Sequence, residues 1–297
     1  MFLLKNLVRD RLINPPPWLP QSTQYLCLMG SVAYGVAADD SDADIYGFCI
    51  PKKDMIFPHL RGEILGFGKQ INRFEQWQQH HVKDEKKGKE YDFQIYSIVK
   101  FFQLCMENNP NMVDALFVPQ RCVIYCSPVG QLVRENRKIF LHRGCWHKFK
   151  GYAYSQLHKI KTKRPQQDSK RYKDIQQYGF DCKFAYHVVR LINEVEQILT
   201  EKNLNLERDR EILKAIRRGE WTEEKITRYF EQKEEQLKNV YHKSDLPYGP
   251  QEDKIKKLLI ECLECYFGNL DEVIHMEKIE RTAIEEISKI CNKILTQ

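Results

Sequence analysis

Two aspartates in alternate positions of one expected strand constrain this chain more than any other feature. Residues 42–50 are mostly apolar and end before a proline, so they predict a buried strand that begins with Asp42 and Asp44. Because side chains alternate between the two faces of a strand, both carboxylates point to the same side. Two carboxylates in a partly buried site repel each other unless a cation neutralises them. Oxygen ligands of this kind favour Mg²⁺ or Mn²⁺.

The segment before this strand predicts a phosphate-binding turn. Residues 24–29 read as a buried strand, Gly30 and Ser31 follow it, and a short helix extends to about Ala37. Free backbone N–H groups at a strand-to-helix junction bind phosphate, and a glycine lets the ligand approach closely. The expected phosphate seat lies one strand away from the carboxylate pair. This arrangement suits a metal-chelated triphosphate.

A third carboxylate is expected from a neighbouring strand, because a two-metal mechanism requires one. Asp92, in the strand-like stretch 90–96, is the best candidate, and Glu90 on the same face is the alternative. In this scheme Asp42, Asp44 and Asp92 are both the metal ligands and the catalytic residues. The metals hold the triphosphate and lower the pKa of an acceptor hydroxyl, which attacks the α-phosphate in line and displaces pyrophosphate.

The pattern of the chain changes near residue 145. Strand-like and helical stretches alternate before it, although 52–89 is polar and irregular, with one short strand expected within 66–74. Helices are expected at 1–14, 97–107, 181–200, 207–218, 222–241, 253–267 and 271–295, and a short helix or strand at 112–117. The sequence therefore predicts an α+β domain over 1–145 and a helical domain over 146–297.

Composition favours a globular protein of the cytoplasm. Of the 297 residues, 42% are hydrophobic and 30% are charged. Apolar runs fall short of the roughly 18 residues that cross a bilayer, and Lys5 comes too early for a signal peptide. The ten cysteines are irregularly spaced, and the C-x-x-C at Cys262 and Cys265 lacks a second pair, so we expect free thiols in a reducing compartment rather than a zinc site.

A basic stretch at 148–173 contains nine Lys or Arg residues and one acid. Tyr152, Tyr154 and Tyr172 lie within it. Cations attract phosphates and aromatic faces stack on bases, so the stretch favours a nucleic-acid partner. Two alternatives stay open: a solvated basic loop, and tyrosines that are buried in a helical core.

A cationic ridge is expected farther along. Lys183, His187 and Arg190 fall at i, i+4 and i+7 of one helix, and Lys159 is a candidate to join them in contacting a triphosphate or an acceptor phosphate. The alternatives are a solvated charged face with a hydrogen-bonded histidine, and a simple ion pair between Arg190 and Glu194.

The carboxylate and glycine–serine segments resemble the nucleotidyltransferases of the DNA polymerase β superfamily. The similarity is closer to a branch of bacterial and phage members, some encoded beside RNA ligases and assigned to RNA repair. The similar segments are Gly30-Ser-Val-Ala-Tyr-Gly35, Ser41-Asp-Ala-Asp-Ile-Tyr-Gly47, Asp92-x-x-x-Tyr96-x-x-x-Lys100-Phe101, Asn109-Pro-Asn111, Gly151-Tyr152, Ser155-Gln156, Lys183-x-x-x-His187-x-x-Arg190-Leu191 and Arg217-x-Gly219-Glu220. They span about residues 24–220.

The resemblance implies a polymerase β-like domain with a mixed sheet, followed by a helical domain that binds nucleotide or acceptor. It implies an NTP as substrate and Mg²⁺ or Mn²⁺ as cofactor. The residues expected to bind nucleotide are Gly30, Ser31, Tyr34, Ser41, Lys159, Lys183, His187 and Arg190. Two positions depart from the pattern: Asp114 stands where a glutamate is expected, and Tyr46 where an arginine is frequent.

Three functions fit these observations. The first is transfer of a nucleoside monophosphate from an NTP to a hydroxyl at an RNA end, in RNA repair or tRNA modification. The second keeps the chemistry and changes the acceptor to a protein side chain or a small molecule. The third is a catalytically silent module that binds nucleotide or RNA, against which the presence of all three carboxylates argues.

Overall fold

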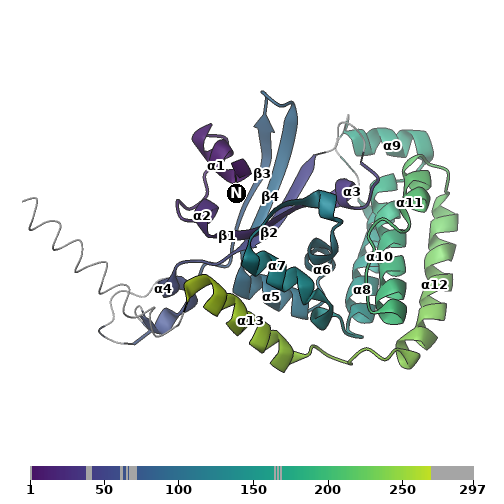
Figure 1. The fold of residues 1–297 in the computed structure, drawn as a ribbon. Helices are drawn as coiled ribbons and strands as arrows, with labels where there is room; N and C mark the ends of the chain where they lie inside the picture. The colour runs from purple at the N-terminus through teal and green to yellow at the C-terminus, as the bar shows by residue number, and fades with distance from the viewer. Residues whose placement is uncertain are drawn as a thin grey trace, which may run out of the picture.

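The computed structural model describes residues 2–37, 42–60, 63–64, 66, 72–163, 165, 167 and 169–268. A five-stranded mixed sheet forms the centre of an α+β fold, and a group of long helices stands beside it (Figure 1). This arrangement confirms the fold class that the sequence predicts. The helix expected at 271–295 lies outside the described residues, as does most of the strand expected within 66–74.

Among the strands of the described residues, one neighbouring pair is parallel, and it lies at the centre of the sheet. Its strands are β1 (Thr23–Leu28), β2 (Ala43–Cys49), β3 (Gln76–Asp84), β4 (Lys89–Ser97) and β5 (Val123–Cys126). Their order is β3-β4-β2-β1-β5, with β2 parallel to β4 and the other neighbours antiparallel. The sequence prediction was wrong at β3, which falls in the stretch read as irregular. β3 is an edge strand, and its Gln and His side chains give no alternating apolar signal.

Each face of the sheet is covered by helices. On one face, α1 (Phe2–Arg9) and α2 (Leu19–Ser22) pack Leu4, Leu7 and Leu19 against apolar side chains of β1, β2 and β4. On the other face lie α5 (Ile98–Met106), α6 (Pro110–Phe117) and α7 (Pro128–Glu135). Each of these three helices begins after a side-chain cap, supplied by Ser97, Asn109 and Ser127.

Short helices and the helical group complete the structure. The single-turn elements are α3 (Gly30–Ala33), α4 (Lys53–Ile56), and 3₁₀ turns at Pro58–Leu60, Gln120–Cys122 and Arg137–Phe140. The longer helices are α8 (Cys145–Thr162), α9 (Lys170–Tyr178), α10 (Cys182–Glu201), α11 (Arg210–Arg217), α12 (Glu223–Lys243) and α13 (Glu252–Phe267). α10 lies between α8 and α12 and is buried along most of its length (Figure 1).

One continuous apolar core joins the two parts of the chain. Buried side chains run without a break from β1 through α5 and α6 into α8, α10 and α12. The last described helix, α13, returns to pack against α7 and α5 beside the sheet (Figure 1). The predicted division at residue 145 therefore marks a change of pattern rather than a gap between two cores, and the two-domain division stays a prediction.

Two further properties concern the described part of the chain. None of its helices is long and apolar enough to cross a membrane. All of its cysteines are free thiols, and Cys262 is buried on α13 while Cys265 is exposed.

Candidate active site

Asp44 and Asp92 lie side by side at the centre of the sheet. The register of the parallel pair sets Asp44 of β2 opposite Asp92 of β4. The two side chains share one face of the sheet, because both strands alternate in step. Burial raises the pKa of the Asp44 carboxyl, the negative charges of Asp92 and Asp42 raise it further, and Lys183 lowers it. The protein thus places negative charges close together beside one cation, which is an environment that favours a bound cation.

Gly30 lets the Asp44 carboxylate come close to the end of β1. The backbone of Gly30 has a positive φ of 63°, and a Cβ built there would lie 2.1 Å from Asp44 Oδ2. Ser31 follows in the single turn of α3, and both residues are partly exposed. Gly30 and the Asp44 carboxylate are therefore in contact, on the neighbouring strands where the sequence analysis expects them.

A bulge in β3 holds Asp92. Gln79 pairs with Phe93 and Val82 with Tyr91, so His80 and His81 together stand opposite Asp92. The extra residue gives His81 a φ of 56° and turns its backbone N–H to Asp92 Oδ1, at 2.7 Å. Sequence reasoning missed this contact, because nothing in the pair of histidines signals a positive φ.

The imidazoles of the bulge lie beside the carboxylates of β4. His80 Nδ1 lies 3.6 Å from Asp92 Oδ1, and His81 Nδ1 lies 2.7 Å from Glu90 Oε1. The hydrogen bond to Glu90, followed by the charge of Asp92, raises the pKa of His81. Glu90, the alternative third carboxylate of the sequence analysis, is thus paired with His81.

Asp42 lies at the exposed start of β2, and Ser41 lies outside the described residues. Within the described part of the chain, no group of three His, Cys, Asp or Glu side chains is gathered closely enough to hold a metal ion. The donor chemistry still fits a hard divalent cation, because Asp44 and Asp92 offer carboxylate oxygens side by side and the charge of Asp92 raises the pKa of Asp44. The set of Asp42, Asp44 and Asp92 as metal ligands stays a prediction.

The cations expected to meet the triphosphate come from α8 and α10. Lys183 is exposed in the first turn of α10, where it acts on the charge of Asp44. Lys159 of α8 and Arg171 of α9 reach the ring of Phe184, with Lys159 Nζ at 5.9 Å and Arg171 Cζ at 3.9 Å from its centroid. Lys159 and Lys183 give the start of α10 a basic surface, whereas Arg171 is paired with Asp181 at 2.8 Å.

His187 lies one turn farther along α10, and its ring packs on that of Tyr186 with centroids 4.2 Å apart. Burial lowers its pKa well below the ordinary value, and the surrounding cations, Arg190 and Lys183 first among them, lower it further. His187 is therefore neutral at neutral pH and does not add a cation to this surface.

Arg190 does not offer its guanidinium to a nucleotide. Its side chain is 5% exposed, and Nη1 lies 2.5 Å from Asp114 Oδ2, 2.8 Å from the Tyr34 hydroxyl and 3.0 Å from Glu194 Oε1. The Tyr34 hydroxyl also donates to Asp114 Oδ2, at 2.7 Å. The ion pair with Glu194 that the sequence left open is present. The contact geometry thus speaks against nucleotide contacts by Arg190 and Tyr34, since both lie in a buried network.

This buried network fastens the glycine–serine turn to the helices. Tyr34 caps the end of α3, Asp114 belongs to α6, and Arg190 and Glu194 belong to α10. Asp114, the departure noted in the sequence, is fully buried and pairs with Arg190. Burial raises the pKa of both Asp114 and Glu194, and the charge of Arg190 lowers it.

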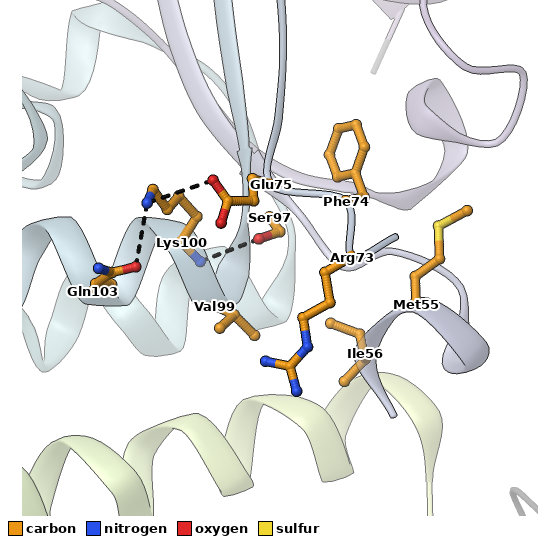
Figure 2. Close-up of a pocket in the computed structure, with 9 residues that line it drawn as sticks. All are labelled: Met55, Ile56, Arg73, Phe74, Glu75, Ser97, Val99, Lys100 and Gln103. Carbon is orange, nitrogen blue, oxygen red and sulfur yellow. Dashed lines mark hydrogen bonds and ion pairs between the residues drawn. The ribbon is translucent and has the colours of Figure 1, made fainter. Parts of the chain in front are cut away.

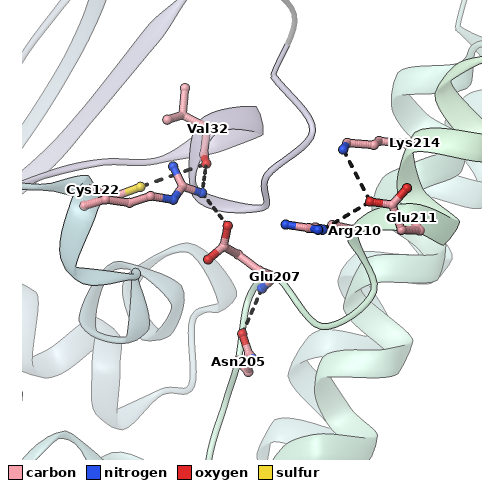
Figure 3. A network of polar contacts seen from close by, with 8 residues as sticks. Val32, Cys122, Asn205, Glu207, Arg210, Glu211 and Lys214 are labelled. Carbon is pink, nitrogen blue, oxygen red and sulfur yellow. Dashed lines mark hydrogen bonds and ion pairs between the residues drawn. The ribbon is translucent and has the colours of Figure 1, made fainter.

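A second set of contacts joins the same turn to the segment before α11. Arg121 donates to the carbonyl of Val32 at 3.0 Å and pairs with Glu207 at 2.5 Å (Figure 3). Arg217 of α11 donates to the carbonyl of Val36 at 2.7 Å. Two arginines from different parts of the chain therefore donate hydrogen bonds to the backbone between Val32 and Val36.

A separate pocket lies at the end of β4 next to α13, away from the carboxylates. Its cavity volume is about 110 Å³, and it is lined by Met55, Ile56, Arg73, Phe74, Glu75, Ser97, Val99, Lys100 and Gln103 (Figure 2). Lys100 is paired there with Glu75 at 3.5 Å and with Gln103 at 3.4 Å. This pocket contains none of the residues expected to take part in catalysis.

Comparison with known families decides which family the chain belongs to. The model of the RNA repair pathway DNA polymerase beta family matches residues 19–260, which is more than half of the chain. The chain belongs to this family. Membership confirms the resemblance drawn from the sequence, and it places the protein among polymerase β-like nucleotidyltransferases of RNA repair. No curated protein matches the chain.

Proposed function

We propose that this member of the RNA repair polymerase β family transfers a nucleoside monophosphate from an NTP to a hydroxyl at an RNA end. One observation carries the proposal: Asp44 and Asp92 lie opposite each other on parallel strands. Asp44 is in contact with Gly30, and the charge of Lys183 lowers the pKa of Asp44. A carboxylate pair beside a glycine turn and a lysine is the set of groups that an in-line attack on a triphosphate requires.

Asp42, Asp44 and Asp92 would hold Mg²⁺ or Mn²⁺, which supplies charge neutralisation and makes the acceptor hydroxyl more acidic. Gly30 and Ser31 face the triphosphate through backbone N–H groups and a hydroxyl. Lys183, with Lys159 on the same basic surface, offsets the negative charge of the phosphates.

The bond changes are those of a nucleotidyl transfer. The acceptor oxygen forms a bond to the α-phosphorus, and the bond from that phosphorus to the bridging oxygen breaks, so pyrophosphate leaves with the electron pair. Asp92 is the proton acceptor for the attacking hydroxyl in this proposal. One of its oxygens is occupied by the His81 N–H, which leaves the other oxygen for that task.

The test is a transfer assay with the purified chain, each of the four labelled NTPs, Mg²⁺ or Mn²⁺, and acceptors from three classes. These are single-stranded RNA and tRNA, a cell-protein mixture, and small hydroxylated molecules. We expect label on RNA and loss of labelling in the Asp44→Asn and Asp92→Asn variants. Label on protein or on small molecules alone would replace the RNA acceptor. Equal labelling by wild type and Asp44→Asn would reject the catalytic assignment.

A further inference from the structure

We infer that Tyr34 is a positioning residue for the nucleotide: its hydroxyl group holds Gly30 and Ser31 in the place that the triphosphate requires, and it does not touch the nucleotide itself. The inference rests on the proposed function, because it assigns to Tyr34 a part in seating the NTP at that same site. This role differs from the direct nucleotide contact that the sequence analysis expects of Tyr34.

The short helix that carries Gly30 and Ser31 does not fix its own orientation. α3 is a single turn of four residues, and no side chain caps its N-terminal end. One helical turn is unstable alone, because its few hydrogen bonds do not offset the entropy of ordering its residues. Contacts from other elements must therefore determine where Gly30 and Ser31 lie.

Tyr34 supplies such a contact at the end of α3. Its side chain is 2% exposed, and its hydroxyl donates to Asp114 Oδ2 at 2.7 Å and accepts from Arg190 Nη1 at 2.8 Å. The guanidinium of Arg190 also lies over the tyrosine ring, with Cζ 4.4 Å from the centroid. The hydroxyl thus has both a donor and an acceptor as partners, so the ring is fixed at its outer end.

The backbone passes this anchoring to the glycine–serine turn. The N–H of Tyr34 donates to the carbonyl of Gly30 at 3.4 Å, and the N–H of Val36 donates to the carbonyl of Ser31 at 2.9 Å. A displacement of Tyr34 therefore moves the groups that the proposed function assigns to the triphosphate. Asp44 stays in place, because β2 is paired with a strand on each side.

Asp114 is a firm anchor for the hydroxyl. It is fully buried on α6, and its Oδ2 accepts from both Tyr34 and Arg190. Its Oδ1 has no hydrogen-bond partner in the described part of the chain. Tyr34→Phe removes one of the two donors and leaves the ion pair between Asp114 and Arg190 in place. The variant loses one hydrogen bond but buries no unpaired charge, so we expect it to fold.

Tyr25 provides a matched control. It is fully buried on β1, and its hydroxyl donates to the carbonyl of Ala115 at 2.7 Å. Ala115 follows Asp114 on α6, so the two tyrosines make hydrogen bonds of equal length to neighbouring residues of one helix. The backbone of Tyr25 is held by the pairing of β1 with β2 and β5, so loss of its hydroxyl leaves the glycine–serine turn in place.

The test measures NTP binding without an acceptor, by equilibrium dialysis of each of the four labelled NTPs with Mg²⁺. We expect the Kd of Tyr34→Phe to rise about fivefold, as loss of one hydrogen bond that orders the binding groups predicts. We expect the Kd of Tyr25→Phe to stay within about twofold of wild type. Urea unfolding should show similar losses of stability in the two variants, so a merely structural role would change both Kd values equally.

Asp114→Ala separates the indirect role from a direct contact. It removes the acceptor of the Tyr34 hydroxyl, while Arg190 keeps its ion pair with Glu194. Because Asp114 is fully buried, its loss acts on the nucleotide only through other residues. We expect the Kd to rise about fivefold in Asp114→Ala and no further in the double variant with Tyr34→Phe. Effects that multiply would show that the hydroxyl contacts the nucleotide directly.

An unchanged Kd in Tyr34→Phe, an equal rise in Tyr25→Phe, or multiplying effects in the double variant would each overturn the inference. If Asp114→Ala does not fold, the comparison of Tyr34→Phe with Tyr25→Phe decides alone. NTP binding that depends on Tyr34 without transfer to RNA rejects the proposed reaction alone. Transfer with unchanged NTP binding by Tyr34→Phe rejects the role of Tyr34 alone, and a wild-type protein that binds no NTP rejects both.

Discussion

The carboxylate of Asp44 lies so close to the α-carbon of Gly30 that the site has no space for a side chain at position 30. A Cβ there would lie 2.1 Å from Asp44 Oδ2, and the φ of +63° is itself unfavourable for other residues. The glycine–serine turn and the Asp44 carboxylate thus form one unit. A change in either displaces the other.

Gly30→Ala should lower the rate of transfer by about 100-fold, because the added methyl group displaces the Asp44 carboxylate by a distance that catalysis does not tolerate. The rate is measured in the labelled-NTP assay, and thermal unfolding checks that the variant is folded. Gly151→Ala is the control, since a Cβ at position 151 on α8 meets nothing within 4 Å. Full activity in Gly30→Ala would mean that the contact with Asp44 has no catalytic role.

The sequence predicted that Asp92 lies on a strand next to that of Asp44, because a two-metal mechanism requires a third carboxylate there, and β2 and β4 are neighbours. Alternation along a strand fixes which side chains share a face, and strands that carry apolar residues on both faces are recognisable as central ones. β3 escaped prediction, since an exposed edge strand rich in Gln and His has no apolar periodicity. The positive φ of His81 escaped it too, because a bulge depends on the register between two strands rather than on one of them.

Arg190 shows a different limit. Spacing along α10 correctly places it on one face with Lys183 and His187, but spacing does not tell which part of that face is covered. The N-terminal end of α10 is exposed at Lys183, whereas α3 and α6 cover the helix two turns later at Arg190. Only tertiary packing decides between a phosphate contact and a buried ion pair.

Arg190→Ala should destabilise the protein by about 3 kcal/mol or more, because it leaves the carboxylates of Asp114 and Glu194 buried without their cation. Urea unfolding measures the change. Arg121→Ala is the control: its pair with Glu207 is partly exposed, so a loss of no more than about 1 kcal/mol is expected. A stable Arg190→Ala variant with a raised KM for NTP would instead support the direct nucleotide contact.

His187 makes stability depend on pH. Burial and the neighbouring cations lower the pKa of His187 in the folded protein. Below about pH 6.5 the unfolded chain therefore binds a proton at His187, whereas the folded chain does not. Stability from this residue is therefore present above pH 6.5 and is lost below it, by about 1.4 kcal/mol per pH unit. Urea unfolding of wild type and His187→Gln at pH 7.5 and 5.5 should show the smaller loss in the variant. Equal losses of unfolding free energy in wild type and His187→Gln between pH 7.5 and 5.5 would show that His187 is not the group responsible.

The backbone N–H of His81, rather than its imidazole, should orient Asp92. His81→Gly keeps the N–H and accepts a φ of 56°, so we expect activity close to wild type. His81→Pro removes the donor and fixes φ near −65°, so we expect a 10- to 100-fold loss of activity, about the cost of removing a hydrogen bond that orients a metal-binding carboxylate. Initial rates over a range of Mn²⁺ concentrations measure the loss, and thermal unfolding reports whether the bulge variants stay folded. If His81→Gly is as impaired as His81→Pro, the imidazole and its contact with Glu90 position Asp92, and the backbone donor does not.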